Sequence, residues 1–342
     1  MTLKVGINGF GRIGRMALRS IIEQNRKDLE VVAINNKSNS ETSSFLLAND
    51  SVHGKLKLNT DLSWTDHTIH LNKKIITMTR ETKISKIDWK HCGHTGSGVD
   101  VVLECTGKFN TIEKSLEHIN AGANKVLVSA PCKGAKNIIF GVNEKDLNSK
   151  DKVISAASCT TNCLAPVAHV LNEEFGIERG FMTTIHSYTG DQRIVDTFHS
   201  TDLRRARSAA TSLIPTKTGA AKAIGLVIPS LEGKLDGTAI RVPTPNVSLI
   251  DFVFNTSRDT SENEINKICI NSSKNDLKNI LSITNEPLVS VDFNHSSYSS
   301  IFDTTQTKVI KKKLCRVVSW YDNEWGFANR LIDLTNYNSK YV

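Results

Sequence analysis

Long apolar runs are missing from this 342-residue sequence, and none approaches the roughly 18 residues of a membrane-spanning helix. Internal repeats and long low-complexity blocks are also missing, which excludes a solenoid and a largely disordered chain. The first residues, Met1 to Ile7, lead directly into a strand pattern without the features of a targeting segment. We therefore expect a folded protein of the cytoplasm, long enough for two domains.

Paired cysteines at short spacing are absent as well. The seven cysteines are scattered along the chain, which argues against a disulfide framework. Cys159 and Cys163 lie four residues apart, but no second Cys/His pair at metal-ligand spacing accompanies them, so we expect no metal site. The formal charge of +8 suits an anionic ligand. Because no basic stripe is interleaved with aromatic residues, nucleic acid is not expected as the primary partner, and Lys308 to Lys313 is interpreted as a solvated strand and turn.

A glycine-rich segment follows the first predicted strand. Lys4 to Asn8 reads as a short buried strand, and the triplet Gly9, Gly11 and Gly14 then leads into a helical pattern. The first glycine permits a tight turn, the second lets the backbone approach a pyrophosphate, and the third lets the helix pack on the strand. A glycine triplet alone often marks only a turn, but its place between strand and helix indicates dinucleotide binding.

The second strand, Val31 to Ile34, is followed by Asn36. At this position the dinucleotide-binding fingerprint has an acidic residue that accepts hydrogen bonds from the ribose hydroxyls. An amide can bond to a hydroxyl but does not repel a 2′-phosphate, and Lys37 follows directly. The sequence therefore predicts NAD binding and leaves NADP use open. The alternative is that Asn36 only turns the chain.

Further buried strands at Val99 to Cys105 and Lys125 to Pro131 enclose a predicted helix at Ile112 to Asn120. Strands that are apolar on both faces and alternate with helices indicate an α/β protein with a parallel, doubly wound sheet. Ligands bind at the carboxyl ends of strands in such sheets, which brings three further residues into consideration. These are Thr106, Gly107 and Ser129.

Cys159 stands where a helix is predicted to begin, after the apolar strand Val153 to Ile154. The partial positive charge of a helix amino end favours a thiolate, so we expect a lowered pKa for this thiol and a role as nucleophile. The alternative is that Cys159 and Cys163 are small buried residues on one helical face. His186 lies on a predicted strand at Gly180 to Thr189, where it is either a packed core residue or the proton acceptor for the thiol.

The carboxyl-terminal half offers candidate anion ligands. The cation-rich segment Asp191 to Thr211 is long for a loop inside a compact domain, which is typical of functional loops. Pro215 to Ala221 offers hydroxyls and backbone before a predicted helix, and Arg241 lies on a strand with one apolar face. A charge-assisted bond from such an arginine to phosphate contributes about 1.5–3 kcal/mol.

Four segments together closely resemble the phosphorylating glyceraldehyde-3-phosphate dehydrogenases: Gly9 to Gly14, Ala157 to Cys163, Arg241 to Val247 and Ser319 to Gly326. His186 to Arg193 looks most like the bacterial and plastid-type members. The resemblance covers essentially the whole chain. It implies a Rossmann doubly wound parallel sheet plus an α+β catalytic domain with a mixed or antiparallel sheet.

The resemblance also implies domain bounds, with an NAD(P)-binding domain at 1–157, completed by a carboxyl-terminal helix at 323–342, and a catalytic domain at 158–322. It implies a homotetramer in which the segment Asp191 to Thr211 reaches a neighbour's cofactor site.

By this resemblance, Cys159 attacks the aldehyde of glyceraldehyde 3-phosphate to form a thiohemiacetal, with His186 as general base. Hydride passes to the nicotinamide, and inorganic phosphate cleaves the resulting thioester to 1,3-bisphosphoglycerate. The residues implied for the substrate phosphate are Thr189, Asp191 and Arg241, and those for the attacking phosphate are Ser158, Thr160, Arg205, Thr218 and Gly219. The cofactor residues implied are Gly9, Gly11, Arg12, Ile13, Gly14, Asn36, Arg80, Thr106, Gly107, Ser129 and Asn323.

Two departures from the family pattern concern the cofactor. Many NAD-specific members carry an aspartate in place of Asn36 and a proline in place of Phe198, and the loop is one residue longer around Ser200 and Thr201. Strict NAD preference is therefore not expected. The sequence does not decide the metabolic direction or the cooperativity of cofactor binding.

Two alternative functions remain. Leu288 to His295 resembles erythrose-4-phosphate dehydrogenases, whereas Thr216 to Lys222 looks like the phosphate loop of the glyceraldehyde enzyme. The second alternative is a non-catalytic protein that binds RNA or protein on the same scaffold. It requires a damaged site, and Cys159, His186 and Arg241 are all present.

Overall fold

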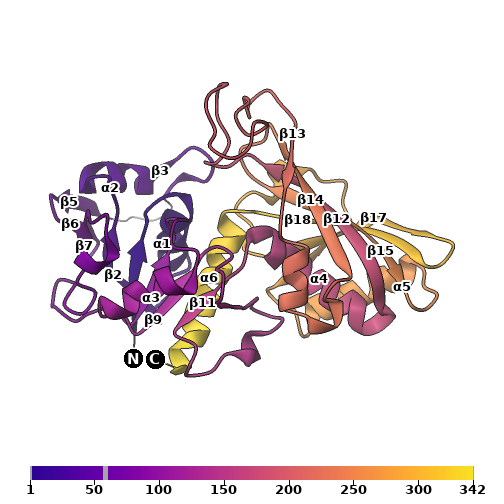
Figure 1. The fold of residues 1–342 in the computed structure, drawn as a ribbon, viewed down its shortest axis with the longest axis horizontal. Helices are drawn as coiled ribbons and strands as arrows, with labels where there is room; N and C mark the ends of the chain where they lie inside the picture. Colours follow the sequence, from indigo (N-terminus) through magenta and orange to yellow (C-terminus); the bar gives the residue numbers. More distant parts are fainter. Residues whose placement is uncertain (1, 57–60, 342) are drawn as a thin grey trace. The chain divides into compact units, whose positions relative to one another are not determined.

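The computed structural model describes residues 2–56 and 61–341. Met1 and Val342, at the ends of the expected domains, lie outside these residues. The chain divides into two compact units, drawn in Figure 1. The first takes in Met1–Ile138, Glu144–Ala157 and Ala328–Val342, and the second takes in Ile139–Asn143 and Ser158–Phe327. Among the helices of the described ranges, none combines the length and apolar character needed to cross a membrane.

A nine-stranded sheet forms the centre of the first unit, counted over its described residues. Its order is β10-β11-β9-β8-β1-β2-β7-β6-β5, and β1 has parallel neighbours on both sides, β2 and β8. The strands are β1 (Leu3–Asn8), β2 (Leu29–Asn35), β5 (Leu62–Thr65), β6 (Thr68–Leu71), β7 (Lys74–Thr79), β8 (Val101–Glu104), β9 (Lys125–Val128), β10 (Lys136–Asn137) and β11 (Val153–Ser155). A separate short pair is β3 (Asn49–Asp50) and β4 (Gly54–Lys55).

The predicted parallel, doubly wound sheet is confirmed. Strand order reverses between β1 and β8, and in such sheets ligands bind outside the carboxyl ends of the strands at this point. The antiparallel strands β5 and β6 at one edge were not anticipated. Their residues are mostly polar or only partly buried, so they lack the continuous apolar run that marked the central strands.

Helices flank this sheet, and Figure 1 shows α1 and α6 side by side, joined by a hydrogen bond from Ser20 Oγ to Asn329 Oδ1 at 3.0 Å. The helices are α1 (Arg12–Glu23), α2 (Ser40–Ala48), α3 (Ile112–Asn120) and α6 (Trp325–Asn338), with short 3₁₀ turns η1 (Ile84–Lys86), η2 (Glu144–Asp146) and η6 (Ser339–Tyr341). The carboxyl-terminal helix thus begins two residues after Asn323, and its part from Ala328 onward belongs to the first unit.

The second unit is built on a seven-stranded mixed sheet of order β13-β14-β12-β15-β18-β17-β16, again over the described residues. The strands are β12 (Ile177–Ser187), β13 (Ile214–Lys217), β14 (Leu235–Val242), β15 (Ser248–Thr256), β16 (Leu281–Thr284), β17 (Ser300–Ile310) and β18 (Leu314–Tyr321). Two helices pack against each other and on the sheet, α4 (Cys159–Phe175) and α5 (Glu262–Lys274). Short 3₁₀ turns are η3 (Lys222–Leu226), η4 (Pro229–Leu231) and η5 (Ser290–Phe293).

Period-two burial along β12 fixes which side chains face the helices. Met182, Thr184 and His186 are buried on one face, whereas Phe181 on the other face is 51% exposed. Phe181 lies opposite the exposed Val253 of β15. The sheet therefore has one covered face, which carries His186, and one face with exposed apolar side chains.

Candidate active site

The glycine triplet of the first unit adopts the geometry that its sequence predicted. Gly9 has φ +94°, a left-handed conformation that side-chain-bearing residues rarely adopt. A Cβ on Gly14 would lie 2.2 Å from the Gly9 carbonyl oxygen, whereas a Cβ on Gly11 would meet nothing within 4 Å. Gly11 caps α1 without a side-chain hydrogen bond, so the first N–H groups of α1 have no side-chain acceptor at this cap. The turn is therefore tight and open enough for an anion at the helix start.

A pocket of about 260 Å³ lies at the carboxyl ends of the central strands. The predicted residues Gly9, Gly11, Asn36 and Thr106 line it. Residues not predicted also line it, from β1, β2 and the turns that follow β7 and β8: Asn8, Asn35, Lys37, Glu81, Thr82, Ile84, Ile87, Cys105, Lys108 and Phe109. Concave, mixed polar and apolar lining beside a glycine turn suits a dinucleotide.

Asn36 is held in place by its neighbours. Its Oδ1 accepts a hydrogen bond from the Phe10 N–H at 3.3 Å, and its Nδ2 donates to Ser38 Oγ and Ser43 Oγ at 2.5 and 3.4 Å. A carboxylate at this position could accept from the same hydroxyls, because a hydroxyl rotates to donate. The site therefore has room for an aspartate without rearrangement.

The other predicted cofactor residues lie outside the pocket lining. Arg12 forms an ion pair with Asp50, and Arg80 Nη2 donates to the Asp66 carbonyl oxygen at 3.2 Å. Ser129 Oγ donates to the Glu104 carbonyl oxygen at 3.0 Å, which joins the ends of β8 and β9. Ile13 lies in the first turn of α1, Gly107 has φ +69° just after β8, and Asn323 belongs to the second unit.

Cys159 is the first residue of α4, as its sequence predicted. Ser158 is the N-cap, and its Oγ accepts a hydrogen bond from the Thr161 N–H at 3.1 Å. Cys159 Sγ lies 3.5 Å from His186 Nε2, a distance at which thiol and imidazole share a hydrogen bond. The two side chains come from α4 and β12, 27 residues apart.

The expected lowering of the Cys159 pKa was wrong. Burial raises the pKa of this thiol and outweighs the opposing effects of Arg241 and of hydrogen bonds to Thr160. The Ser158 cap also satisfies one of the N–H groups that would otherwise face the sulfur. Burial together with the nearby Arg241 lowers the pKa of His186 to about 3, so its imidazole is neutral at physiological pH. Both shifts favour the uncharged forms of the thiol and the imidazole.

Arg241 lies on β14 directly opposite His186 in the parallel register. Its Nη1 is 2.6 Å from His186 Nδ1 and donates to the Ser187 carbonyl oxygen at 2.9 Å. The same carbonyl lies 2.7 Å from His186 Nδ1. The carbonyl favours a proton on Nδ1, whereas the guanidinium favours a bare Nδ1, so Arg241 and the Nδ1–H compete for one acceptor.

Tyr321 was not predicted as a site residue, although it lies inside one of the family-like segments. Its hydroxyl bonds to Thr160 Oγ1 at 2.8 Å and to Thr184 Oγ1 at 2.9 Å, and its ring packs edge-on to His186 with centroids 5.9 Å apart. Tyr321 thereby connects the start of α4 to β12. The hydroxyl of Thr160, predicted to bind phosphate, is engaged in this buried contact.

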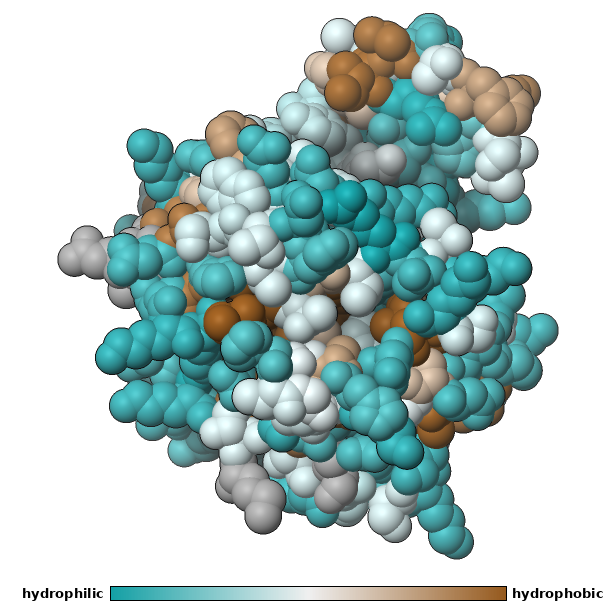
Figure 2. Space-filling model, turned by 90° about the vertical axis from the view of Figure 1, so that its left-hand side faces the viewer, coloured by the Kyte–Doolittle hydropathy of each residue, from teal (hydrophilic) through white to brown (hydrophobic). Residues whose placement is uncertain are grey.

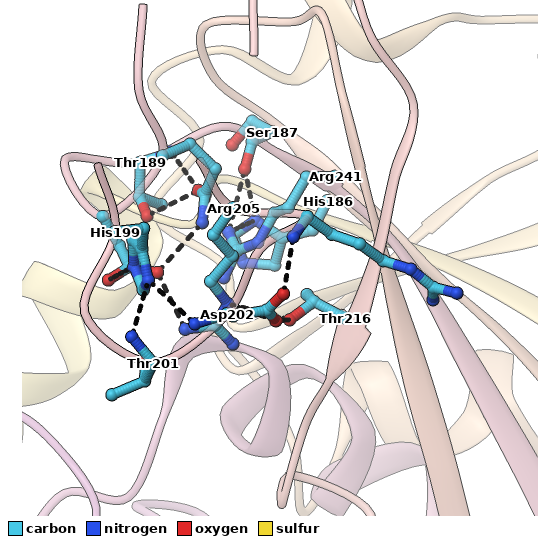
Figure 3. Close-up of polar contacts among 12 residues, drawn as sticks. His186, Ser187, Thr189, His199, Thr201, Asp202, Arg205, Thr216 and Arg241 are labelled. Atoms are coloured by element: carbon cyan, nitrogen blue, oxygen red, sulfur yellow. Dashed lines mark hydrogen bonds and ion pairs between the residues drawn. The ribbon is translucent and has the colours of Figure 1, made fainter. Parts of the chain in front are cut away.

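Arg205, a predicted anion ligand, takes part in the polar contacts drawn in Figure 3. Arg205 Nη1 pairs with Asp191 Oδ2 at 2.8 Å, and its Nε donates to Thr216 Oγ1 at 2.8 Å. His199, which sequence analysis passed over, lies 3.4 Å from Asp191 Oδ1, and its Nδ1 accepts from the Asp202 N–H at 3.2 Å. Arg205 and Asp191 therefore satisfy each other in this state.

Among the other predicted anion ligands, Thr189 and Thr218 make hydrogen bonds to nearby residues of their own loops, and Gly219 has accessible backbone. Thr189 Oγ1 donates to Gln192 Oε1 at 3.1 Å, and Thr218 Oγ1 accepts from the Ala220 N–H at 3.2 Å. A Cβ on Gly219 would meet nothing within 4 Å, so the backbone there is accessible to a ligand. The loop that precedes this region exposes large apolar side chains, and Figure 2 shows such side chains in brown at the top of its view.

Both units contain segments that match known protein families. Residues 3–112 match the family model described as glyceraldehyde 3-phosphate dehydrogenase, NAD binding domain, and residues 158–323 match the one described as glyceraldehyde 3-phosphate dehydrogenase, C-terminal domain. The chain is 52% identical over 336 residues to the glyceraldehyde-3-phosphate dehydrogenase of Cereibacter sphaeroides and 54% identical over 334 residues to that of Xanthobacter flavus. It is 49% identical over 339 residues to that of Geobacillus stearothermophilus. The alignments cover 97–98% of each chain.

Proposed function

The chain belongs to the glyceraldehyde-3-phosphate dehydrogenase family and is an NAD-dependent oxidoreductase, and from this premise we propose that it oxidises and phosphorylates glyceraldehyde 3-phosphate to 1,3-bisphosphoglycerate. The observation that carries the proposal is the 3.5 Å distance between Cys159 Sγ and His186 Nε2 at the start of α4. A thiol and an imidazole at this distance are the nucleophile and base that covalent aldehyde oxidation requires.

Proton transfer from Cys159 to His186 accompanies attack on the aldehyde. The sulfur forms a bond to the carbonyl carbon, the carbonyl electron pair moves to oxygen, and the thiol proton passes to Nε2. Coupling the two events removes the need for a stable thiolate in the resting enzyme, which agrees with the raised pKa of Cys159. General base catalysis of this kind contributes roughly 10²–10⁴-fold to rates.

The later steps use the same two side chains. His186 returns the thiol proton to the alkoxide oxygen, which completes the thiohemiacetal, and takes this hydroxyl proton back as the carbonyl of the thioester forms. When bound, the nicotinamide ring accepts the hydride. Inorganic phosphate then attacks the thioester carbon, the carbon–sulfur bond breaks, and Cys159 leaves as the thiolate and regains its proton from His186.

Arg241 is suited to hold a phosphate group. Its Nε is buried and has no hydrogen-bond acceptor among the described residues, which is costly unless a ligand supplies one. When phosphate draws the guanidinium away, the Ser187 carbonyl is left for the Nδ1–H of His186, and Nε2 becomes the proton acceptor that faces the sulfur. We place Thr189 and Asp191 with Arg241 at the substrate phosphate, and Ser158, Thr160, Arg205, Thr218 and Gly219 at the attacking phosphate.

The cofactor proposal uses the residues of the first unit. Gly9, Gly11 and Gly14 shape the pyrophosphate turn at the start of α1, and Asn36 would bond the adenine ribose. Arg12, Ile13, Arg80, Thr106, Gly107 and Ser129 remain predicted cofactor contacts. In the second unit, Asn323 is proposed to bind the nicotinamide carboxamide. Use of NADP alongside NAD stays a prediction, which substitution of Asn36 tests.

We also propose a homotetramer. Support comes from exposed apolar residues that an isolated chain would leave in water, both on the sheet at Phe181 and on the loop at Ile194 (81% exposed), Phe198 (79%) and Leu203 (87%). In the assembly this loop would reach a neighbour's cofactor site. A cytoplasmic location stays a prediction from the sequence.

The decisive experiment is a steady-state assay of the purified protein with glyceraldehyde 3-phosphate and with erythrose 4-phosphate, each with and without inorganic phosphate. We expect rapid, phosphate-dependent reduction of NAD with the three-carbon aldehyde. A rate that does not depend on phosphate, or a preference for erythrose 4-phosphate, would contradict the proposal. The relatives reported above give no support to the erythrose alternative or to a non-catalytic role.

A further inference from the structure

Three buried polar side chains of the second unit form a closed cluster beside the thiol site: Ser187, Ser248 and Asn323. Asn323 Oδ1 accepts hydrogen bonds from Ser187 Oγ at 2.8 Å and from Ser248 Oγ at 2.9 Å. The two serines are fully buried, and Asn323 is only 5% exposed. None of these serines was singled out by sequence analysis as a site residue.

The direction of each hydrogen bond follows from the donors available. The backbone N–H of Ser187 donates to Ser248 Oγ at 3.1 Å, so this oxygen is already an acceptor and its own proton is free to be donated. The two hydroxyl protons need acceptors, and the Asn323 oxygen serves both. Rotating the amide by 180° would remove that acceptor and leave at least one buried hydroxyl proton without a good partner.

The opposite end of the amide has no such partner. Within the part of the chain that the structure describes, Asn323 Nδ2 makes no hydrogen bond, and its atom is not among the fully enclosed ones. The amide therefore has an anchored oxygen and an open N–H₂ group. An open donor on a side chain that is 95% buried indicates a ligand with an acceptor oxygen.

Rigid elements hold the cluster. Ser187 ends β12, Ser248 begins β15, and these strands pair through Ile185 opposite Leu249. Ser248 also lies opposite Tyr321, the last residue of β18, two residues before Asn323. The amide orientation is thus set by three neighbouring strands rather than by a mobile loop.

We propose that Ser187 and Ser248 are positioning residues that fix the Asn323 amide so that its N–H₂ group faces the carboxamide oxygen of nicotinamide and thereby selects the ring face presented for hydride transfer. This inference rests on the proposed function, which assigns the nicotinamide to Asn323. Each serine acts through Asn323 and does not touch the reacting atoms.

Binding of NAD is compared with binding of ADP-ribose, which lacks the nicotinamide, by quenching of tryptophan fluorescence. In Ser187→Ala, Ser248→Ala and the double variant, we expect NAD affinity to fall, by about tenfold in the double variant, while ADP-ribose affinity stays unchanged. A second readout is stereospecificity, measured as the fraction of deuterium delivered to the wrong face of the ring, which we expect to rise. Equal loss of affinity for both ligands, or no loss for either, would overturn the inference.

Ser300→Ala is the matched control, because Ser300 is a fully buried serine of the same sheet whose hydroxyl bonds to Ser319 Oγ at 2.7 Å and not to Asn323. It should leave both affinities and the stereospecificity unchanged. Asn323→Ala distinguishes failure of the nicotinamide assignment from failure of the positioning role of the two serines. If Asn323→Ala leaves the ratio of NAD to ADP-ribose affinity unchanged, the assignment of nicotinamide to Asn323 fails. If it changes the ratio and the serine variants do not, the positioning role is wrong.

Discussion

The cofactor pocket of the first unit and the thiol site of the second are built in opposite ways. The pocket is shaped by backbone at strand ends and by one glycine turn, whose three glycines lie within six residues of sequence. The thiol site is assembled from side chains on α4, β12, β14 and the end of β18, which span Cys159 to Tyr321. Dinucleotide binding therefore depends on local conformation, whereas the thiol chemistry depends on long-range packing.

The electrostatics of the two sites differ as well. At the glycine turn, the positive end of the α1 dipole attracts an anion, and the N-cap Gly11 makes no side-chain hydrogen bond to the helix. At Cys159, Ser158 caps the helix and burial controls the pKa, which rises. A helix amino end attracts charge only to the extent that its N–H groups are free and desolvation is small.

The largest effect is expected from Cys159→Ser, which changes the thiol site alone. Cys159→Ser should lower the rate of reduced-cofactor formation by about 10⁴-fold or more, because a hydroxyl is a much weaker nucleophile beside the same base. NAD affinity should stay within about twofold, because the pocket of the first unit is unchanged. Cofactor absorbance measures the first quantity and fluorescence titration the second. Cys163→Ser, one turn further along α4, is the control and should retain most activity, and a Cys159→Ser enzyme with substantial turnover would exclude Cys159 as the nucleophile.

The buried base makes the stability of the second site depend on pH. His186 stays neutral in the folded protein down to a pKa of about 3, whereas the unfolded chain takes up this proton near the ordinary value of 6.5. The unfolded state binds more protons between these values, so stability is present above pH 6.5 and is lost as pH falls. Proton uptake by the unfolded chain should therefore lower the free energy of unfolding by about 3 kcal/mol as the pH falls from 6.5 to about 4.

His186→Gln and His186→Asn should remove that part of the pH dependence, as measured by chemical denaturation at a series of pH values. Wild-type and variant curves that run parallel over this window would show that His186 is not held neutral. Below it, Asp50, whose pKa is lowered to about 2 by hydrogen bonds from Arg12 and from the backbone against the opposing effect of burial, contributes a separate loss of stability as its carboxylate is protonated.

A pair of alanine substitutions sharpens the comparison within the glycine turn. Gly14→Ala should destabilise the protein by about 2 kcal/mol, because its Cβ would meet the Gly9 carbonyl oxygen at 2.2 Å. Gly11→Ala should leave the melting temperature unchanged and weaken NAD binding, because its Cβ points into open space where the pyrophosphate is expected. Calorimetry and NAD titration of both variants test this, and equal destabilisation by the two changes would contradict the assigned roles.

The smallest effect concerns cofactor choice. Asn36→Asp should lower NADP use relative to NAD by about tenfold, because a carboxylate repels the 2′-phosphate and fits the existing contacts to Ser38 and Ser43. The ratio of kcat/KM for the two cofactors is the measurement. The neighbouring Asn35→Asp is unsuitable as a control, because Asn35 bonds Asn8 and Glu81 within the sheet. An unchanged ratio in Asn36→Asp would show that another residue, such as Lys37 in the same pocket, decides the preference.

Sequence patterns anticipated the parts of the molecule that local chemistry specifies. The strand and glycine turn of residues 4–14, the helix Ile112–Asn120 and the start of α4 at Cys159 follow from apolar periodicity, glycine spacing and capping residues. The roles of Tyr321, Ser187 and Ser248 did not, since their side chains depend on partners 61 to 161 residues away, and the role of His199 depends on a loop conformation. Tyr321 lies in a segment that resembles the family, but no periodicity in the sequence predicts the residues that its side chain contacts.

By itself, the sequence determined the doubly wound sheet, the position of the glycine turn and the place of Cys159 at the start of a helix, because these depend on neighbours within a few residues. Only the tertiary structure decided the distance from sulfur to imidazole, the competition at the Ser187 carbonyl and the direction of the Cys159 pKa shift. Burial sets a proton affinity through every atom that replaces water around the group, and those atoms are contributed by strands and helices distant in the chain.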